Sequence, residues 1–312
     1  MQAMNKRKII VVGIGGVGNN TITRINEMEI KNIHTIAINT DAQDLYHCQA
    51  DEKILLGENS AVNSLNRPED AEALAEENAD VIKEKLEDAN MVFISCGLGG
   101  IAGSGSAPVI SKIAKKLNAL TIAIVTMPLF DEGFLKGKTA MKSLKKLQDN
   151  ADTVIVIPID KLLEVTPNLT IDNAFLVPDG ILTHVIKSIA ELITNQSLLS
   201  LSFKDIQLIM EESGIGMVCI GESNSQNRAI ESAHQALNWP LLDCNISEAK
   251  SAIINISASS NITLYESEKI VQIIADNLNP ETEIVWGIQI DDSLENTIRT
   301  TMIITGIEHN LI

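Results

Sequence analysis

The sequence is poor in cysteine, in aromatic residues and in positive charge. Its four cysteines lie far apart with no CxxC pair, so neither a zinc site nor a disulfide framework is expected, and the thiols are expected to be free and buried. Aromatic residues make up 3% of the chain, which leaves few platforms for stacking single-stranded nucleic acid. The formal net charge of −17 also argues against nucleic acid as a partner, because phosphate contacts need a positive surface.

Long hydrophobic runs are absent as well. No run of 18 or more apolar residues occurs, so direct membrane insertion is not expected. The N-terminal residues MQAMNKRKII pass straight into a strand-like run rather than into a signal peptide. At 312 residues with 45% hydrophobic content, the chain can bury a large core and has room for two domains. We therefore expect a cytoplasmic, globular protein.

The first half alternates short apolar runs with helical stretches. Runs that are apolar on both faces are typical of a parallel sheet covered on both sides. The pattern predicts a doubly wound α/β domain with strands at Ile9–Val12, Thr35–Ile38, Met91–Ser95, Leu120–Thr126 and Thr153–Ile157. An acidic helix is predicted over Pro68–Leu86, with a buried stripe formed by Ala71, Leu74, Ala75, Val81, Ile82 and Leu86.

The second half begins with a very apolar helix, predicted over Asp179–Thr194. Beyond it the pattern predicts a smaller α/β domain with a four-stranded sheet. Its expected strands are Gly216–Ile220, Ser251–Ser257, Glu283–Ile290 and Thr300–Thr305, and its expected helices are Arg228–Asn238 and Glu266–Leu278. The expected division is 1–177 for a nucleotide-binding domain, 178–200 for a central helix and the loop after it, and 201–312 for an assembly domain.

A first glycine-rich turn follows the first predicted strand. It reads GIGGVGNN over residues 13–20, with a helix expected from near Thr21. Backbone N–H groups can approach a phosphate closely at such a turn, and a helix N-terminus favours an anion. The GxGxxG spacing also fits a dinucleotide site, with Asp41 about 23 residues after Gly18 as the ribose-binding acid. A tight turn without any ligand is the other alternative.

A second glycine cluster favours one of these alternatives. Residues 96–108 read CGLGGIAGSGSAP after another predicted strand, and a helix is expected from Val109. Two such turns on neighbouring strands face one crevice at the carboxyl ends of an open α/β sheet. A dinucleotide fold needs only the first turn, so a polyphosphate held from two sides is the better explanation.

The ordered motifs of the chain resemble the FtsZ branch of the tubulin/FtsZ family, and its archaeal members in particular. They include GIGGVGNNTITRI at 13–25, AINTDAQDL at 37–45, MVFISCGLGG and GSGSAPVI within 91–110, VIVIPIDKLL at 154–163, IAELIT at 189–194, IGESNSQNRA at 220–229 and WGIQIDDSLENTIR at 286–299. The resemblance implies GTP or GDP as the ligand and leaves Mg²⁺ open as an accompanying ion.

The resemblance also implies roles for individual residues. Glu132 would contact the ribose, Phe175 would stack on the base, and Asp179 would accept from the N–H groups of guanine, a donor pair that adenine lacks. The alternative for Asp179 is a helix N-cap. The full set of expected nucleotide-binding residues is Gly15, Gly16, Val17, Gly18, Asn19, Asn20, Asp41, Gly100, Gly103, Ser104, Gly105, Glu132, Lys136, Phe175 and Asp179. No metal ligand is identified.

The chain departs from the family pattern at several functional positions. Ile101 and Ala102 replace a glycine and a hydroxyl in the second turn, the loop at 60–68 lacks the usual glycines, and Lys136 replaces an arginine. The family resembles NxDxxD in the loop that enters the next subunit, whereas this chain has Ser200 and Ser202, and only Asp205 remains as a catalytic candidate. Loss of a carboxylate there is expected to weaken hydrolysis, unless Asp205 suffices.

The leading hypothesis is a filament-forming cytoskeletal protein of the cell-division type, which stacks head to tail with copies of itself. It is either a working GTPase or, as we favour, a relative with weak or lost hydrolysis. The alternatives are an NAD-type dinucleotide-binding oxidoreductase and a nucleotide-free structural or regulatory paralogue. Bacterial relatives end in a peptide that docks on membrane adaptors, whereas this sequence finishes at residues 308–312, so an adaptor partner stays unidentified.

Overall fold

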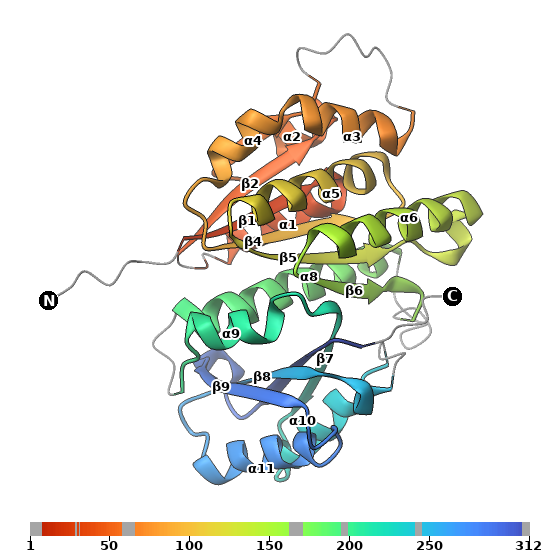
Figure 1. The fold of residues 1–312 in the computed structure, drawn as a ribbon. Coiled ribbons are helices and arrows are strands. Elements are labelled where there is room, and N and C mark those ends of the chain that lie inside the picture. Colours follow the sequence, from red (N-terminus) through yellow and green to blue (C-terminus); the bar gives the residue numbers. More distant parts are fainter. Residues whose placement is uncertain are drawn as a thin grey trace, which may run out of the picture. The chain divides into compact units, whose positions relative to one another are not determined.

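The structure is a computed structural model that describes residues 8–28, 30, 32–57, 66–161, 171–194, 199–240 and 245–307, apart from the side chains of 171–176 and 194. The chain divides into two compact units, Met1–Lys187 and Ser188–Ile312, which are described separately below. Figure 1 shows the elements of both.

The first unit is built on a parallel sheet with the strand order β3-β2-β1-β4-β5-β6. The strand order reverses between β1 and β4, because β2 and β3 are added on one side of β1 and β4, β5 and β6 on the other. Ligands of open α/β sheets bind at this place, beyond the carboxyl ends of the strands. The strands are β1 (Ile9–Ile14), β2 (Ile33–Asn39), β3 (Glu52–Leu55), β4 (Met91–Gly97), β5 (Leu120–Met127) and β6 (Thr153–Pro158).

Helices cover both faces of this sheet. In Figure 1, α3 to α6 lie in front of the strands, and right-handed crossovers place α1 on the opposite face from α5. Because both faces are covered, every residue of β1 is buried and only the last residue of β4 is partly exposed. The helices are α1 (Gly15–Glu27), α2 (Ala42–His47), α3 (Pro68–Glu77), α4 (Ala79–Leu86), α5 (Ile101–Lys116), α6 (Phe134–Asn150) and the short 3₁₀ turn η1 (Phe130–Glu132).

The second unit contains a four-stranded mixed sheet with the order β7-β10-β8-β9. Only β8 and β9 run parallel. The strands are β7 (Gly214–Ser223), β8 (Ser251–Ala258), β9 (Glu283–Ile290) and β10 (Ile298–Thr305). The helices are α9 (Phe203–Met210), α10 (Arg228–Leu237) and α11 (Leu264–Ala275), with 3₁₀ turns η2 (Ile246–Glu248) and η3 (Asp292–Leu294). The boundary between the two units falls within α8 (Ile171–Thr194).

An ion pair fastens α10 to α11 in the second unit. The Arg228 guanidinium donates to both carboxylate oxygens of Glu266, at 2.7 and 3.2 Å, and also to the side chain of Asn261. Glu266 closes a capping box with Thr263 at the start of α11. The Arg228 guanidinium lowers the pKa of Glu266 to about 2. This carboxylate therefore finds its partners within the unit.

The fold class predicted from the sequence is confirmed, but several element boundaries are wrong. Helix α1 begins at Gly15 rather than near Thr21, and α5 begins at Ile101 rather than at Val109, so both glycine runs extend into their helices. The helix predicted over Pro68–Leu86 is broken at Asn78, and Val81 is 45% exposed instead of buried.

Two further differences concern the edges of elements. The edge strand β3 was not predicted from the sequence, and α8 begins at Ile171, eight residues before Asp179. Pro178 therefore lies inside a helix. Among the described residues, no helix is long and apolar enough to cross a membrane. Of the four cysteines, Cys48, Cys96 and Cys219 are buried as predicted and form no disulfide, and Cys244 lies outside the described residues.

Candidate nucleotide site

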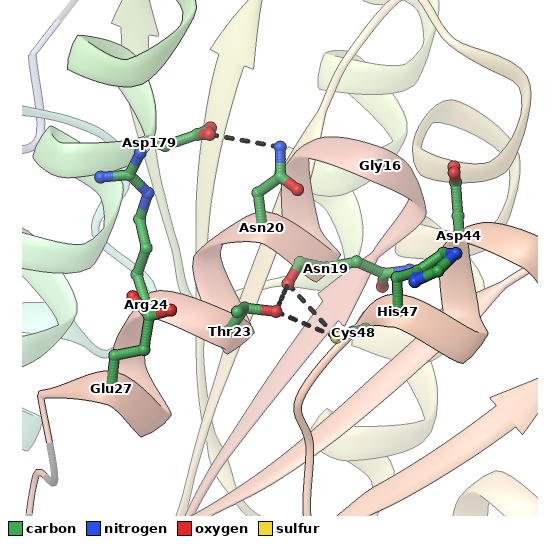
Figure 2. A pocket seen from close by; sticks show the side chains of 10 residues that line it. All are labelled: Gly16, Asn19, Asn20, Thr23, Arg24, Glu27, Asp44, His47, Cys48 and Asp179. Carbon is green, nitrogen blue, oxygen red and sulfur yellow. Dashed lines mark hydrogen bonds between the residues drawn. The ribbon is translucent and has the colours of Figure 1, made fainter.

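A cavity of about 630 Å³ lies in the first unit, beside α1. Its wall is formed by one face of α1, by α2 and the residue after it, and by α8 (Figure 2). The lining residues are Gly16, Asn19, Asn20, Thr23, Arg24, Glu27, Asp44, His47, Cys48 and Asp179. The cavity therefore reaches Gly16 at the start of α1, directly after the carboxyl end of β1.

The first glycine turn needs its glycines for two different reasons. Gly15 has a φ of +69°, which L side chains rarely adopt. Gly13 and Gly18 pack backbone on backbone, and a Cβ at Gly18 would lie 2.4 Å from the carbonyl oxygen of Ser95 on β4. Gly16 is different, since a Cβ there would meet nothing nearer than Asp44 at 3.8 Å. Gly16 is thus left open on the cavity side.

The second glycine turn shows the same division. A Cβ at Gly103 would lie 2.5 Å from the carbonyl oxygen of Gly97, and one at Gly105 would lie 2.1 Å from that of Pro68 on α3. These two glycines are explained by packing. Gly99 has a φ of +96°, and its N–H donates to the hydroxyl of Ser104 at 2.8 Å. At Gly100, by contrast, a Cβ would meet nothing within 4 Å.

Two helix N-termini meet at these turns. A Cβ at Gly15 would lie 3.3 Å from the Cβ of Ala102 and 3.5 Å from the N of Gly103, so the starts of α1 and α5 adjoin. Neither helix has a side-chain cap or an acidic residue in its first turn. Uncapped N–H groups and two helix dipoles together favour an anion such as a phosphate. Ile101 lies in the first helical turn and not among the residues with positive φ, so its replacement of a glycine causes no backbone strain.

Asp179 lies across the cavity from α1 and is 6% exposed. Its carboxylate accepts one hydrogen bond, from Asn20 Nδ2 at 3.3 Å (Figure 2). Burial raises the pKa of Asp179 to about 6, against the opposing effects of the Arg24 charge and of the Asn20 hydrogen bond. The residue is in the interior of α8, so the N-cap alternative is wrong. A buried carboxylate with so few hydrogen-bond donors around it is suited to a ligand that supplies N–H donors.

The other side of the cavity lies between α1 and α2. Cys48 donates to the carbonyl oxygen of Asn19 at 3.3 Å, and burial raises the pKa of its thiol. Asn19 is 4% exposed, and neither Nδ2 nor Oδ1 of its side chain has a hydrogen-bond partner. Such an amide needs a partner from outside the protein, because an unpaired buried polar group is costly.

The structure brings only part of the predicted site to the cavity wall. Of the predicted residues, Gly16, Asn19, Asn20 and Asp179 line it. Asp41 instead caps α2 and accepts from the N–H groups of Gln43 and Asp44. The predicted residues of the two turns that do not line it are Gly15, Val17, Gly18, Gly100, Gly103, Ser104 and Gly105.

Glu132 and Lys136 pair with each other at 2.7 Å on the loop and helix after β5, away from the cavity wall. The side chain of Phe175 and residues 60–65 of the loop at 60–68 lie outside the described residues. Sequence reasoning also missed lining residues, above all Arg24. It follows Asn20 by one helical turn, so the helical period of α1 places both side chains on one face.

The candidate catalytic residue Asp205 is in the first turn of α9. Its carboxylate accepts from the N–H of Ser202 at 2.8 Å, and the Ser202 hydroxyl accepts from the N–H of Asp205 at 3.3 Å. The two residues form a capping box. Asp205 thus holds the helix start in this structure. No cluster of three metal-ligating side chains occurs among the described residues.

Comparison with known proteins matches both units to one family. Residues 8–167 match the tubulin/FtsZ family GTPase domain, and residues 214–308 match the FtsZ family C-terminal domain. The chain belongs to the tubulin/FtsZ family. The FtsZ resemblance seen in the motifs is thereby confirmed, and this is a family of cytoskeletal GTPases of cell division that bind GTP and GDP.

Individual relatives support the same assignment. The cell division protein FtsZ of Methanothermobacter thermautotrophicus is 52% identical over 305 residues, covering 97% of this chain and 80% of the relative. FtsZ 1 of Thermococcus kodakarensis is 49% identical, with 96% and 81% covered. A solved FtsZ dimer of M. jannaschii superposes with a TM-score of 0.93 at 44% identity, covering 97% of this chain and 89% of that chain. CetZ2 from Haloferax volcanii, at 17% identity and a TM-score of 0.82 with 97% and 94% covered, shares the fold.

Proposed function

We propose that this chain binds a guanine nucleotide in the cavity beside α1. The observation that carries the proposal is the pairing of two features: uncapped helix starts at Gly15 and Ile101, and the underpartnered carboxylate of Asp179. The helix starts suit the phosphates, and the carboxylate suits the donor pair of guanine. Asp41, which a dinucleotide site would need for its ribose, is used as a helix cap, so the oxidoreductase alternative is disfavoured.

The second part of the proposal is head-to-tail assembly of copies of the chain into a cytoplasmic filament of the cell-division type. Solved relatives support it, since one is an FtsZ dimer and a more distant one is a protofilament with bound GTPγS. In this assembly residues 1–177 would hold the nucleotide, residues 178–200 would form the central helix and its loop, and residues 201–312 would cap the nucleotide of the next subunit. A membrane-adaptor protein remains a partner to be sought.

The third part is slow hydrolysis. Asp205 is engaged in the capping box with Ser202, and Ser200 and Ser202 offer hydroxyls where the family pattern has Asn and Asp. A hydroxyl of ordinary pKa is a poor general base at neutral pH, whereas a carboxylate can orient and deprotonate water. Mg²⁺ would accompany the phosphates, where it could neutralise charge.

Calorimetric titration of the purified chain with GTP and with ATP tests the binding proposal. We expect GTP to bind at least tenfold more tightly, and Asp179→Ala to remove most of that difference. Asp149→Ala, on the exposed face of α6, is the matched control that removes one carboxylate elsewhere and is expected to leave binding unchanged. Absence of GTP and GDP binding at millimolar concentration would favour the nucleotide-free paralogue.

Hydrolysis is tested by restoring the family pattern with Ser200→Asn and Ser202→Asp together. We expect phosphate release to rise by roughly 10²-fold, the typical contribution of a positioned acid or base. Ser202→Thr is the control, because it keeps a capping hydroxyl at the start of α9 but adds no carboxylate. Fast release by the unmodified chain would contradict this part of the proposal, and sedimentation with electron microscopy tests assembly.

A further inference from the structure

Arg24 lines the cavity and lies within the motif at 13–25, yet the proposed function gives it no role. It follows Asn20 by four residues on α1, so both side chains project from the same face of that helix toward Asp179 (Figure 2). Its charge acts on the Asp179 carboxylate, yet no ion pair within 4 Å joins Arg24 to a carboxylate among the described residues. The guanidinium is therefore available to a ligand.

The charged groups around Asp179 show which of them can act on its carboxylate. On α1, Glu27 is exposed at the end of the helix, and on α2 the titratable side chains lie on the far side of the cavity (Figure 2). The charge of Arg24 acts on the Asp179 carboxylate, which is buried and accepts one long hydrogen bond. The titratable groups that line the cavity together with Asp179 are Arg24, Glu27, Asp44, His47 and Cys48.

The chemistry of purines decides what this arrangement recognises. When a carboxylate accepts from N1–H and the 2-amino group of guanine, the atoms on either side of that donor pair are O6 and N3, and both are acceptors. Asn20 and Arg24 carry hydrogen-bond donors beside the carboxylate. Each of them therefore faces an acceptor of guanine, whether it lies on the O6 side or on the N3 side. Adenine lacks the donor pair and carries an amino group at C6, which would meet these donors unfavourably.

We propose that Arg24 is a base-specificity residue of this cavity, selecting a purine whose donor pair is flanked by acceptors and rejecting one that carries a 6-amino group. This inference rests on the proposed function. Arg24 acts in two ways. It favours the ionised form of Asp179, which is the form that accepts both N–H groups, and it opposes an amino group placed against it. The ligand class is a 2-amino-6-oxopurine nucleotide.

The test measures GTP, ATP and ITP affinity for the unmodified chain, Arg24→Gln and Arg24→Lys at pH 6.0, 7.0 and 8.5. For Arg24→Gln we expect the GTP affinity to fall about tenfold at pH 7 while that for ATP is unchanged or rises. GTP affinity is expected to recover at pH 8.5, because Asp179 ionises again there. Arg24→Lys keeps the charge and is expected to keep most of the discrimination. ITP lacks the 2-amino group and is expected to depend less on the substitution.

Lys112→Gln is the matched control, because it removes one positive charge from an exposed position on α5. An equal loss of GTP and ATP affinity in Arg24→Gln, with no change in their ratio or in pH dependence, would overturn the inference while leaving nucleotide binding intact. If the unmodified chain binds neither nucleotide, the proposed function fails first. A second readout needs no nucleotide: carboxyl ¹³C NMR of the empty protein is expected to show a higher titration midpoint for Asp179 in Arg24→Gln, and an unchanged midpoint would also overturn the inference.

Discussion

Asp179 in the first unit is a buried carboxylate and Glu266 in the second is a partly buried one, and their hydrogen-bond partners differ. Glu266 accepts two hydrogen bonds from Arg228 and closes a capping box, and its pKa is lowered to about 2. Asp179 accepts one hydrogen bond at 3.3 Å, and its pKa is raised to about 6. A carboxylate that stabilises the fold has its hydrogen-bond donors inside the protein, whereas a carboxylate that binds a ligand has few donors until the ligand is present.

The glycines of the two turns divide along the same line. The space beside Gly105 is filled by the carbonyl group of Pro68, and the space beside Gly100 is empty. Glycines in one motif therefore serve either backbone packing or access for a ligand. Substitutions that change stability without changing ligand binding, or the reverse, test this distinction.

The largest expected effect is at Gly105. A methyl group added there would lie 2.1 Å from a backbone oxygen that cannot move away alone, so Gly105→Ala is expected to cost about 3 kcal/mol of unfolding free energy. Gly100→Ala is expected to change it by less than about 0.5 kcal/mol. Urea unfolding followed by circular dichroism measures both, and equal losses would break the distinction.

Next in size is the ion pair of the second unit. Glu266→Gln removes the charge opposite Arg228, and we expect a loss of about 2 kcal/mol because the mostly buried guanidinium keeps only neutral acceptors. Glu268→Gln, on the exposed face of the same helix, is the control and is expected to be nearly neutral. Urea midpoints for the two variants give the comparison directly.

Gly100→Ala is expected to weaken binding although it leaves the fold intact. The added methyl group occupies the space through which a phosphate approaches the start of α5, and we expect a roughly tenfold lower GTP affinity, or about 1.4 kcal/mol. Calorimetry on the folded variant measures this loss. Unchanged affinity would place the phosphates away from the second turn.

Asp179→Asn is expected to stabilise the fold, whereas Glu266→Gln is expected to destabilise it. It removes a buried charge that lacks donors, so the empty protein should gain about 1 kcal/mol at pH 7 while losing its preference for GTP. Thermal unfolding without nucleotide and calorimetry with GTP measure the two changes. A destabilised variant would show that the carboxylate is satisfied after all.

The smallest expected effect is a pH dependence. Because the pKa of Asp179 is raised in the folded state, the folded protein binds more protons than the unfolded chain between about pH 4 and 6, so this group's contribution to stability improves as pH falls through that window. The stability gap between Asp179→Asn and the unmodified chain should therefore narrow from pH 7 to pH 5. Glu266 behaves oppositely, since its contribution is lost only as pH falls below about 4.5 toward 2.

Much of the fold could be predicted from the sequence, because strands buried on both faces read as continuous apolar runs such as Ile9–Val12. The edge strand Glu52–Leu55 was missed since it is short and carries two charged residues. Helix starts were placed too late because glycines were interpreted as loop. In fact Gly15 and Gly103 lie in first helical turns, where they allow two helices and a strand to approach closely.

The site was predicted in part. Gly16, Asn19 and Asn20 could be found from the first glycine motif, and Asp179 from the family resemblance, and all four line one cavity. Arg24 was missed although it lies four residues after Asn20 on α1 and therefore on the same face of that helix. His47 and Cys48 could not be found, since they join the wall only through the tertiary packing of α1 against α2. Whether a motif glycine faces a ligand or a neighbouring backbone also depends on that packing, and no local pattern encodes it.

The close contact between Gly105 and Pro68 has an evolutionary consequence. Gly18, Gly103 and Gly105 are constrained by the backbone around them, so a lineage that abandoned nucleotides would still retain them. Gly16 and Gly100 would then be free to drift. Relatives that differ at those two positions, and not at the other three, are the ones in which loss of the ligand should be sought first.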